Sequence, residues 1–170
     1  MSKLIPDLVF QSIYDITPQQ LLARGVRGAL IDLDGTMASH CDPLPPEPLT
    51  PFIRSLQNAG LRVLIFSNNR RTRVSRFCAA LGVDFICRAG KPFPRGFRQA
   101  AAQLGLQADA LAVIGDQIFT DVLGGNLAGA LTCYVETLDR RFFWVNLRYQ
   151  FERRFIARGR KKMEDGTQHE

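Results

Sequence analysis

The sequence predicts an α/β protein, a parallel sheet of about five strands with helices on both faces. Two observations predict this class. Short apolar runs of strand length alternate with longer segments in which apolar residues recur at helical spacing. Most of these longer segments end at a glycine. Strands that alternate with helices form a parallel sheet through right-handed crossovers, which cover both of its faces. The length of 170 residues fits one domain.

The first half of the chain contains two of the expected strands. Thr17-Pro18 and Thr50-Pro51 each have the pattern of a helix N-cap followed by the first helical residue. Four prolines within residues 37–48 mark a loop. The expected elements are, in order, a helix at 19–24, a strand at 28–33, the loop at 37–48, a helix at 50–60 and a strand at 62–66.

The second half contains the other three strands, and glycines mark its helix ends. Gly82, Gly105 and Gly129 each follow a helical pattern and suit the left-handed conformation that closes a helix. The expected elements are, in order, a helix at 71–81, a strand at 83–87, a helix at 94–104, a strand at 111–114, a helix at 121–128 and a strand at 131–135.

Composition narrows the class of protein. Hydrophobic residues make up 46% of the chain, which suffices for a core at this size. No apolar run reaches the roughly 18 residues that a membrane span needs, and the N-terminus lacks the pattern of a signal peptide. The four cysteines form no C-x-x-C pair, so reduced thiols are expected rather than disulfides or a zinc site. We therefore expect a cytoplasmic protein without a transmembrane segment.

Two carboxylates, Asp32 and Asp34, lie two residues apart at the end of the first strand. Residues i and i+2 of a strand point to the same side, so both side chains converge at the carboxyl edge of the sheet, where α/β proteins bind ligands. Carboxylates so close repel each other unless a cation intervenes, and Mg²⁺ is the cation that oxygen ligands favour. The alternative is a turn in which the aspartates bond their own backbone.

Three further polar motifs follow in an order that favours the functional interpretation. An enzyme that transfers phosphoryl groups needs such residues. Its transition state spreads negative charge over three oxygens, and Mg²⁺ and a lysine would both stabilise that charge. Taken singly, Ser67-Asn68 could cap the next helix, alone or in addition to a role in the site, Lys91 could be a surface lysine and Asp121 a helix N-cap. The three motifs are Ser67-Asn68-Asn69 after the second strand, Lys91-Pro92, and the acidic pair Asp116 and Asp121 after the fourth strand.

Together the four motifs resemble those of phosphatases of the haloacid dehalogenase (HAD) superfamily, beginning with the D-x-D-x-T run at 32–36. Segments 11–17 and 115–126 further resemble the YqeG-type family of HAD subfamily IIIA, which is related to mitochondrial phosphatidylglycerophosphate phosphatases. The resemblance covers residues 5–158 and implies the three-layer, Rossmann-like HAD fold. Gly35 departs from the asparagine usual in that family, although glycine is common there elsewhere in the superfamily.

The resemblance implies a role for each motif. Asp32 would be the nucleophile that takes the phosphoryl group as an aspartyl phosphate. Asp34 would be the general acid that protonates the leaving oxygen and then the base that activates water. Ser67 and the backbone of Asn68 would bind the phosphoryl oxygens. Lys91 would neutralise charge on the phosphate and on the nucleophile.

The resemblance also implies a Mg²⁺ site, built from the oxygen ligands that this ion prefers. Its ligands would be the Asp32 carboxylate, the Asp34 backbone carbonyl and the Asp116 carboxylate. Asp121 would be a further ligand, either direct or through water.

The gaps between the motifs are too short for the cap domain that many HAD enzymes carry. Residues 37–66 hold a loop, a helix and a strand, and residues 70–90 hold a helix and a strand. Neither gap leaves room for a domain of about 50 residues. We therefore expect a capless protein with an open site, which a bulky phosphate ester on a membrane or macromolecule would complete.

Four residues near the motifs are candidates for contacts with the substrate. Arg70, Arg71 and Arg73 could bind an extra anionic group of the substrate. They lie at the start of a predicted helix, where cations are slightly unfavourable because they oppose the helix dipole, and this penalty favours a role in binding a ligand. Alternatively, they are a solvated helix start. His40 is either a substrate contact or an exposed loop residue.

The C-terminal residues 140–158 predict an amphipathic, basic helix, followed by a flexible tail at 159–170. Two interpretations stay open: peripheral contact with anionic lipid through residues 140–162, or packing of the apolar stripe on the sheet. The stripe consists of Phe143, Leu147, Phe151 and Phe155, with Trp144 and Ile156 alongside, and the other side carries Arg148, Arg153, Arg154 and Arg158.

We therefore predict a Mg²⁺-dependent phosphomonoester hydrolase. The first substrate hypothesis is a phospholipid headgroup, with phosphatidylglycerophosphate converted to phosphatidylglycerol at the inner face of a membrane. A phosphoprotein, a nucleotide or a sugar phosphate is the alternative substrate. An alternative of another class is a basic RNA-associated protein with a residual HAD fold: the net charge of +6 suits nucleic acid, but no RNA-binding motif is visible.

Overall fold

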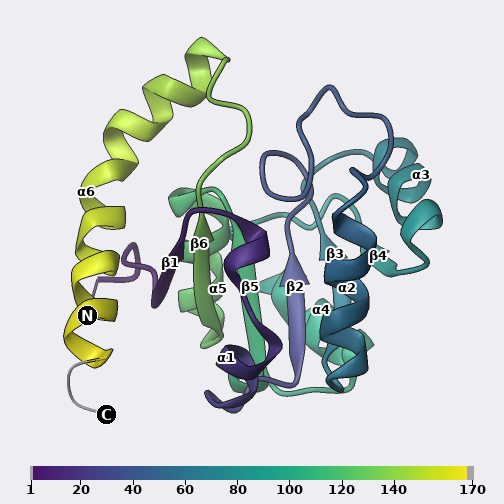
Figure 1. The fold of residues 1–170 in the computed structure, drawn as a ribbon, viewed down its shortest axis with the longest axis horizontal. Coiled ribbons are helices and arrows are strands. Elements are labelled where there is room, and N and C mark those ends of the chain that lie inside the picture. The colour runs from purple at the N-terminus through teal and green to yellow at the C-terminus, as the bar shows by residue number, and fades with distance from the viewer. Residues whose placement is uncertain (1, 168–170) are drawn as a thin grey trace.

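The structure, a computed structural model, describes residues 2–167 and centres on a six-stranded sheet. All its strand pairs are parallel, in the order β1-β6-β5-β2-β3-β4, which confirms the predicted α/β class (Figure 1). The strands are β1 (Leu8–Phe10), β2 (Gly28–Ile31), β3 (Arg62–Phe66), β4 (Asp84–Ile86), β5 (Leu111–Gly115) and β6 (Leu131–Val135).

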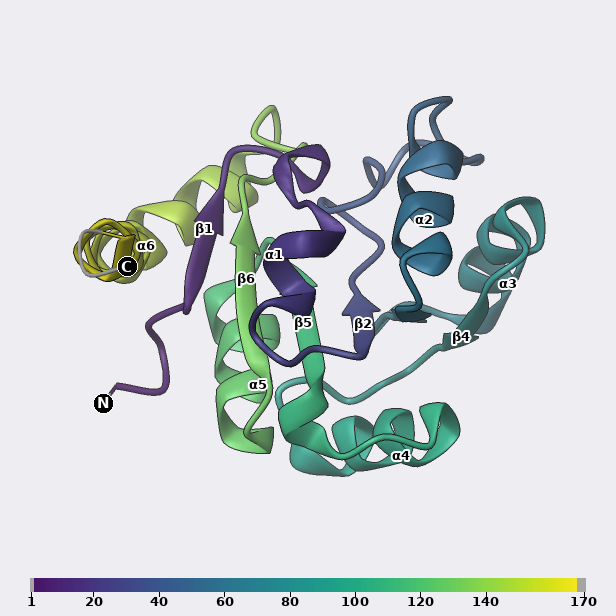
Figure 2. The same ribbon diagram turned by 60° about the horizontal axis from the view of Figure 1, so that its bottom comes forward.

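Helices cover both faces of this sheet and one of its edges. Both views show α6 along β1 at one edge and α3 near β4 at the other (Figure 1 and Figure 2). The helices are α1 (Pro18–Leu22), α2 (Leu49–Asn58), α3 (Arg71–Leu81), α4 (Pro94–Leu104), α5 (Leu123–Ala128) and α6 (Phe143–Thr167). Three shorter turns are η1 (Ile13–Asp15), η2 (Ala108–Ala110) and the π-type turn η3 (Ile118–Val122).

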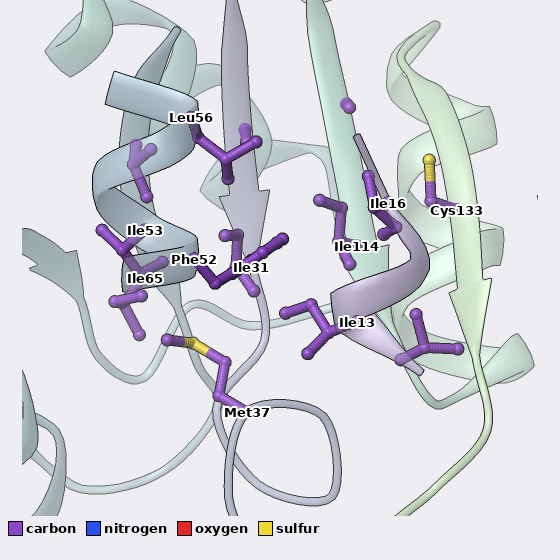
Figure 3. Close-up of a cluster of buried hydrophobic side chains, with 14 of the residues drawn as sticks. Ile13, Ile16, Ile31, Met37, Phe52, Ile53, Leu56, Ile65, Ile114 and Cys133 are labelled. Carbon is purple, nitrogen blue, oxygen red and sulfur yellow. The ribbon is translucent and has the colours of Figure 1, made fainter. Parts of the chain in front are cut away.

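Because both faces are buried, the strands read in sequence as continuous apolar runs. Ile31 of β2 points to the face covered by α1, α2 and α3, and its neighbour Leu30 points to the face covered by α4. Figure 3 shows Phe52 and Leu56 projecting from α2 toward β2 on the first of these faces. The apolar residues that recur at helical spacing in α2 are therefore those that face the sheet.

The sheet has one strand more than the five expected. The additional strand is β1, which the sequence analysis did not recognise within the aliphatic N-terminal segment. It is three residues long, and its partner is β6, far along the chain. Asp7 anchors the pairing, since its backbone N–H donates to the Thr132 carbonyl at 3.0 Å. Helix α6 packs on β1, and Gly159 allows this close approach: a Cβ there would lie 2.6 Å from Pro6 Cγ.

The C-terminal helix is longer than expected. Helical backbone continues to Thr167, whereas a flexible tail was expected from residue 159. Two ion pairs tie this part of α6 to the sheet: Lys162 Nζ lies 2.6 Å from Asp7 Oδ1, and Arg160 lies 2.8 Å from Glu136 Oε1. The segment is also rich in residues that favour helix. Residues 168–170 of the expected tail lie outside the described residues.

The connections at the carboxyl edge agree with the capless prediction. Between β2 and β3 the chain forms only the loop and α2, and between β3 and β4 it forms only α3. Within residues 2–167, no helix combines the length and the apolar character that crossing a bilayer requires.

We predict that Gly96→Ala lowers the free energy of unfolding by about 1–3 kcal/mol. A Cβ at Gly96 in α4 would lie 2.0 Å from the Ala89 carbonyl oxygen, so the backbone would have to move. In a free helix the same change would stabilise by about 1 kcal/mol. Urea unfolding measures the difference. The control is Gln103→Ala, at an exposed position of α4, which should stay within about 0.5 kcal/mol of the wild type. A more stable Gly96→Ala protein would contradict this close packing.

Candidate active site

The sheet brings three of the four sequence motifs to its carboxyl edge. Asp32 follows β2, Ser67 follows β3 and Asp116 follows β5. Strand β2 lies between β3 and β5, and Ile31 pairs with Ile65 and Ile114, so the three motifs begin within one residue of the same level. The chain continues from β2 to one side and later returns to the other, which is the switch point where α/β sheets bind ligands.

A buried acidic cluster forms the centre of this edge. One carboxylate oxygen from each of Asp32, Asp116 and Asp121 lies within 4.8 Å of the others, and all three side chains are buried. Lys91 enters the cluster with its Nζ 2.5 Å from Asp32 Oδ1 and 2.6 Å from Asp121 Oδ1. Three oxygen donors so close together fit a hard divalent cation such as Mg²⁺.

Burial controls the protonation of the cluster. It raises the pKa of Asp32 to about 8, an effect that Lys91 opposes and Asp121 reinforces. Burial also raises the pKa of Asp116, against the lowering effect of Arg148. Although burial alone would lower the pKa of Lys91, the Asp121 and Asp32 carboxylates raise it overall. Lys91 therefore stays charged, and the carboxylates favour additional positive charge nearby.

Asp34 lies outside this cluster and is held by two donors. Its Oδ1 accepts a hydrogen bond from Arg73 Nε at 2.8 Å, and its Oδ2 accepts one from Asn69 Nδ2 at 2.9 Å. Gly35, with φ of +89°, turns the chain away immediately after Asp34. A Cβ at Gly35 would lie 2.6 Å from Asp116 Oδ2, so the packing at this position favours glycine.

Ser67 and Asn68 line the pocket described below and do not cap the next helix. The alternative that they cap α3 is wrong, because Arg70 is the N-cap residue and no side chain caps that helix. Ser67 is buried, and its Oγ accepts a hydrogen bond from the Asn69 N–H at 3.1 Å. The Asn68 amide bonds the Lys91 backbone twice, to its N–H at 2.8 Å and to its carbonyl at 3.1 Å. This clamp fixes where the lysine enters the cluster.

These residues line a pocket with a volume of about 360 Å³. His40 belongs to its wall, and its ring and backbone N–H both bond Asp139. The orientation of His40 therefore depends on a residue from the loop after β6. The pocket is lined by Asp32, Asp34, His40, Ser67, Asn68, Asn69, Lys91, Gln117 and Thr120.

The three arginines expected near the substrate differ in position. Arg73 reaches the site: besides Asp34, it donates to the Asp42 and Ser39 carbonyls at 2.6 and 2.9 Å. It thereby joins the loop after β2 to α3. Arg70 is exposed and Arg71 lies over the Phe85 ring, and the pocket wall contains neither of them.

Two residues of α6 lie at the site although the sequence analysis did not place them there. Arg148, expected on the outer basic side of the helix, instead turns inward, and its Nη2 lies 2.9 Å from Asp116 Oδ2. Glu152, one turn later, pairs with Arg148 Nε at 3.3 Å and accepts a hydrogen bond from the Ile118 N–H at 2.9 Å. Burial raises the pKa of Glu152 to about 7. Buried carboxylates require a cation, and an Arg/Glu pair at i and i+4 is the signal that could have indicated it.

Comparisons with known proteins agree with this geometry. A family model of haloacid dehalogenase-like hydrolases matches residues 40–129. A Bacillus subtilis protein named as a phosphatase, YqeG, is 35% identical over 159 residues, 93% of this chain and 92% of its own. The chloroplastic phosphatidylglycerophosphate phosphatase 1 of Chlamydomonas reinhardtii is 28% identical over 91% of this chain, which spans 61% of that protein.

Solved structures share the fold at lower identity. The deoxy-D-mannose-octulosonate 8-phosphate phosphatase of Haemophilus influenzae, in a cobalt-bound form, superposes with a TM-score of 0.53 at 20% identity, covering 66% of this chain and 69% of its own. A HAD subfamily IIIA hydrolase of Legionella pneumophila gives 0.50 at 18% identity, covering 86% and 92%. These likenesses show the fold.

We predict that Arg148→Gln, measured by urea unfolding with a chelator present, lowers the free energy of unfolding by about 2–3 kcal/mol, because it leaves two buried carboxylates without their cation. The side chain is 25% exposed, so the loss stays below that for a fully buried pair. Adding Glu152→Gln to this variant should cost less than in the wild type. The control is Arg153→Gln, at an exposed position of α6, with a change within about 0.5 kcal/mol. Equal losses in the Arg148 and Arg153 variants would show that the pairing contributes nothing.

Proposed function

Because the chain belongs to the haloacid dehalogenase-like hydrolases and is a phosphatase, we propose that it hydrolyses phosphomonoesters with Mg²⁺ through an aspartyl-phosphate intermediate. One observation carries the proposal: Asp32 lines the pocket while its Oδ1 bonds the buried Lys91. A carboxylate next to a fixed cation can approach a phosphate, because the lysine neutralises charge on both groups.

In this proposal each pocket residue takes one task. A carboxylate oxygen of Asp32 attacks phosphorus, and the bond from phosphorus to the alcohol oxygen breaks. Asp34, oriented by Asn69 and Arg73, gives its proton to that oxygen and then takes a proton from the water that hydrolyses the aspartyl phosphate. Ser67 and the backbone of Asn68 hold the phosphoryl oxygens.

The proposed metal ligands are the carboxylates of the acidic cluster, joined by the Asp34 backbone carbonyl. Asp32 and Asp116 would bind the ion directly, and Asp121, which also bonds Lys91, would bind directly or through water. Bound Mg²⁺ would offset repulsion within the cluster and neutralise charge on the phosphate.

The proposed substrate is a phospholipid headgroup, phosphatidylglycerophosphate, at the cytoplasmic face of a membrane. The relatives named as phosphatidylglycerophosphate phosphatases support this choice. So does the open pocket, because the chain forms no cap domain within residues 2–167. A soluble ester such as a sugar phosphate is the second candidate, because about 360 Å³ would hold a small ester whole.

Asp32→Asn is expected to lower phosphate release by at least about a thousandfold, since the amide cannot form the acyl phosphate. Acid quenching during turnover of a ³²P-labelled ester should leave label on the wild-type protein and none on the variant. Asp109→Asn, at an exposed position near the opposite edge of the sheet, is the control and should keep full activity. Hydrolysis by Asp32→Asn at the wild-type rate would overturn the proposed nucleophile.

Mg²⁺ is expected to raise the thermal unfolding midpoint of the wild-type protein, because it binds the folded acidic cluster and not the unfolded chain. Asp116→Asn should abolish most of that increase, whereas Asp109→Asn should keep it. The measurement needs no substrate, so it tests the metal site separately from catalysis. An equal increase in the Asp116 variant would place the ion elsewhere.

The lipid hypothesis is tested with phosphatidylglycerophosphate in mixed micelles against a panel of phosphoproteins, nucleotides and sugar phosphates. We expect kcat/KM for the lipid to exceed that for each soluble ester by at least about tenfold, because remote binding contributes to catalysis. A higher kcat/KM for a sugar phosphate or nucleotide would overturn the lipid substrate while leaving the reaction itself intact.

A further inference from the structure

Near its N-terminal end, α6 exposes large apolar side chains that the sheet leaves uncovered. The expected stripe is divided: Phe155 and Ile156 pack against Val9 and Tyr134, whereas Trp144 is 75% exposed and Phe143 70%. We call the uncovered part the α6 apolar surface. It consists of Phe143, Trp144, Leu147 and Phe151, and Leu138 and Phe142 in the loop just before the helix are exposed as well.

The charge around this surface is mostly positive. Residues 138–151 contain one acidic residue, Asp139, which is buried and bonded to Ser39 and His40. The neighbouring Glu152 is buried too and pairs with Arg148. Exposed arginines lie near the apolar side chains in the sequence: Arg141, Arg153 and Arg154, and also Arg140, which pairs with Glu136. Exposed phenylalanines and a tryptophan beside arginines fit an anionic lipid surface, which takes both kinds of side chain.

The α6 apolar surface and the pocket both lie toward the carboxyl ends of the strands. Its preceding loop contacts the loop after β2 through Arg141, whose Nη2 donates to Ser39 Oγ at 2.7 Å, and through Asp139, which holds the pocket residue His40. The N-terminal half of α6 and the 37–48 loop both rise beyond the carboxyl ends of the strands (Figure 1). A flat anionic surface that binds there meets the side of the molecule on which the pocket lies.

We propose that the α6 apolar surface docks onto an anionic phospholipid bilayer and so holds the pocket at the level of the lipid headgroups. The inference rests on the proposed lipid substrate and names the surface that reaches it. Aromatic rings enter the boundary between headgroups and acyl chains, and the bordering arginines remain among the phosphates. The attraction is partly electrostatic, so binding weakens as salt is added.

Trp144 makes the docking directly measurable, because it is the only tryptophan of the chain. Wild-type protein is titrated with vesicles of phosphatidylglycerol and phosphatidylcholine, and separately with phosphatidylcholine alone. We expect a blue shift and an intensity increase of the tryptophan emission with the anionic vesicles, and binding at least about tenfold weaker to the neutral ones. Neither vesicle contains a phosphomonoester, so the result does not depend on catalysis.

Matched variants assign the binding to the surface. Leu147→Ser and Phe143→Ser should each weaken co-sedimentation with anionic vesicles at least about fivefold. Leu127→Ser, at a leucine of similar exposure on α5, should leave it unchanged. The Leu147 variant should also lose hydrolysis of the lipid ester in vesicles and keep hydrolysis of a soluble aryl phosphate.

Two results would overturn the proposal. The first is a tryptophan emission that anionic vesicles leave unchanged. The second is a dimer in light scattering that Leu147→Ser dissociates, with no vesicle binding, since the surface would then join two copies of the chain. If the protein binds vesicles but does not hydrolyse phosphatidylglycerophosphate, the proposed substrate fails and the docking surface stands.

Discussion

Repulsion among buried carboxylates is the constraint on which the rest of this site depends. Three aspartates converge at the end of the sheet, where little water screens them. Two cations from distant parts of the chain offset them: Lys91, held by the Asn68 amide, and Arg148, held by Glu152. The loop after β3 and the C-terminal helix therefore have to be placed as accurately as the strands themselves.

The sequence predicted best those elements whose own residues determine them. Helices α3 and α4 have the expected bounds, since glycines in the left-handed conformation end both of them. Strands β3 and β6 also match, because burial on both faces makes most of their residues apolar. Strand β1 escaped prediction because its three residues form a strand only by pairing with β6, a contact that no local pattern carries.

The same distinction applies to the site. The positions of Asp32, Ser67 and Asp116 follow from the sequence, because a parallel sheet aligns the residues that come after its strands. The sequence gives only a hint that Arg148 turns inward, the Glu152 four residues later, since both sides of α6 carry arginines and the docking of the helix determines which of them is buried. The contact of Asn69 with Asp34 could not be predicted, because it depends on the turn between β3 and α3.

The pairing of Arg148 with Asp116 also bears on how the molecule is assembled. Chains emerge from the ribosome N-terminus first, so β2 to β5 can pair while residue 148 is still unsynthesised. Until then the acidic cluster has Lys91 but not Arg148, and the edge strand β1 lacks the helix that packs on it. The reactive end of the sheet is thus completed last, and a chain terminated before α6 would carry every motif aspartate without the guanidinium that balances them.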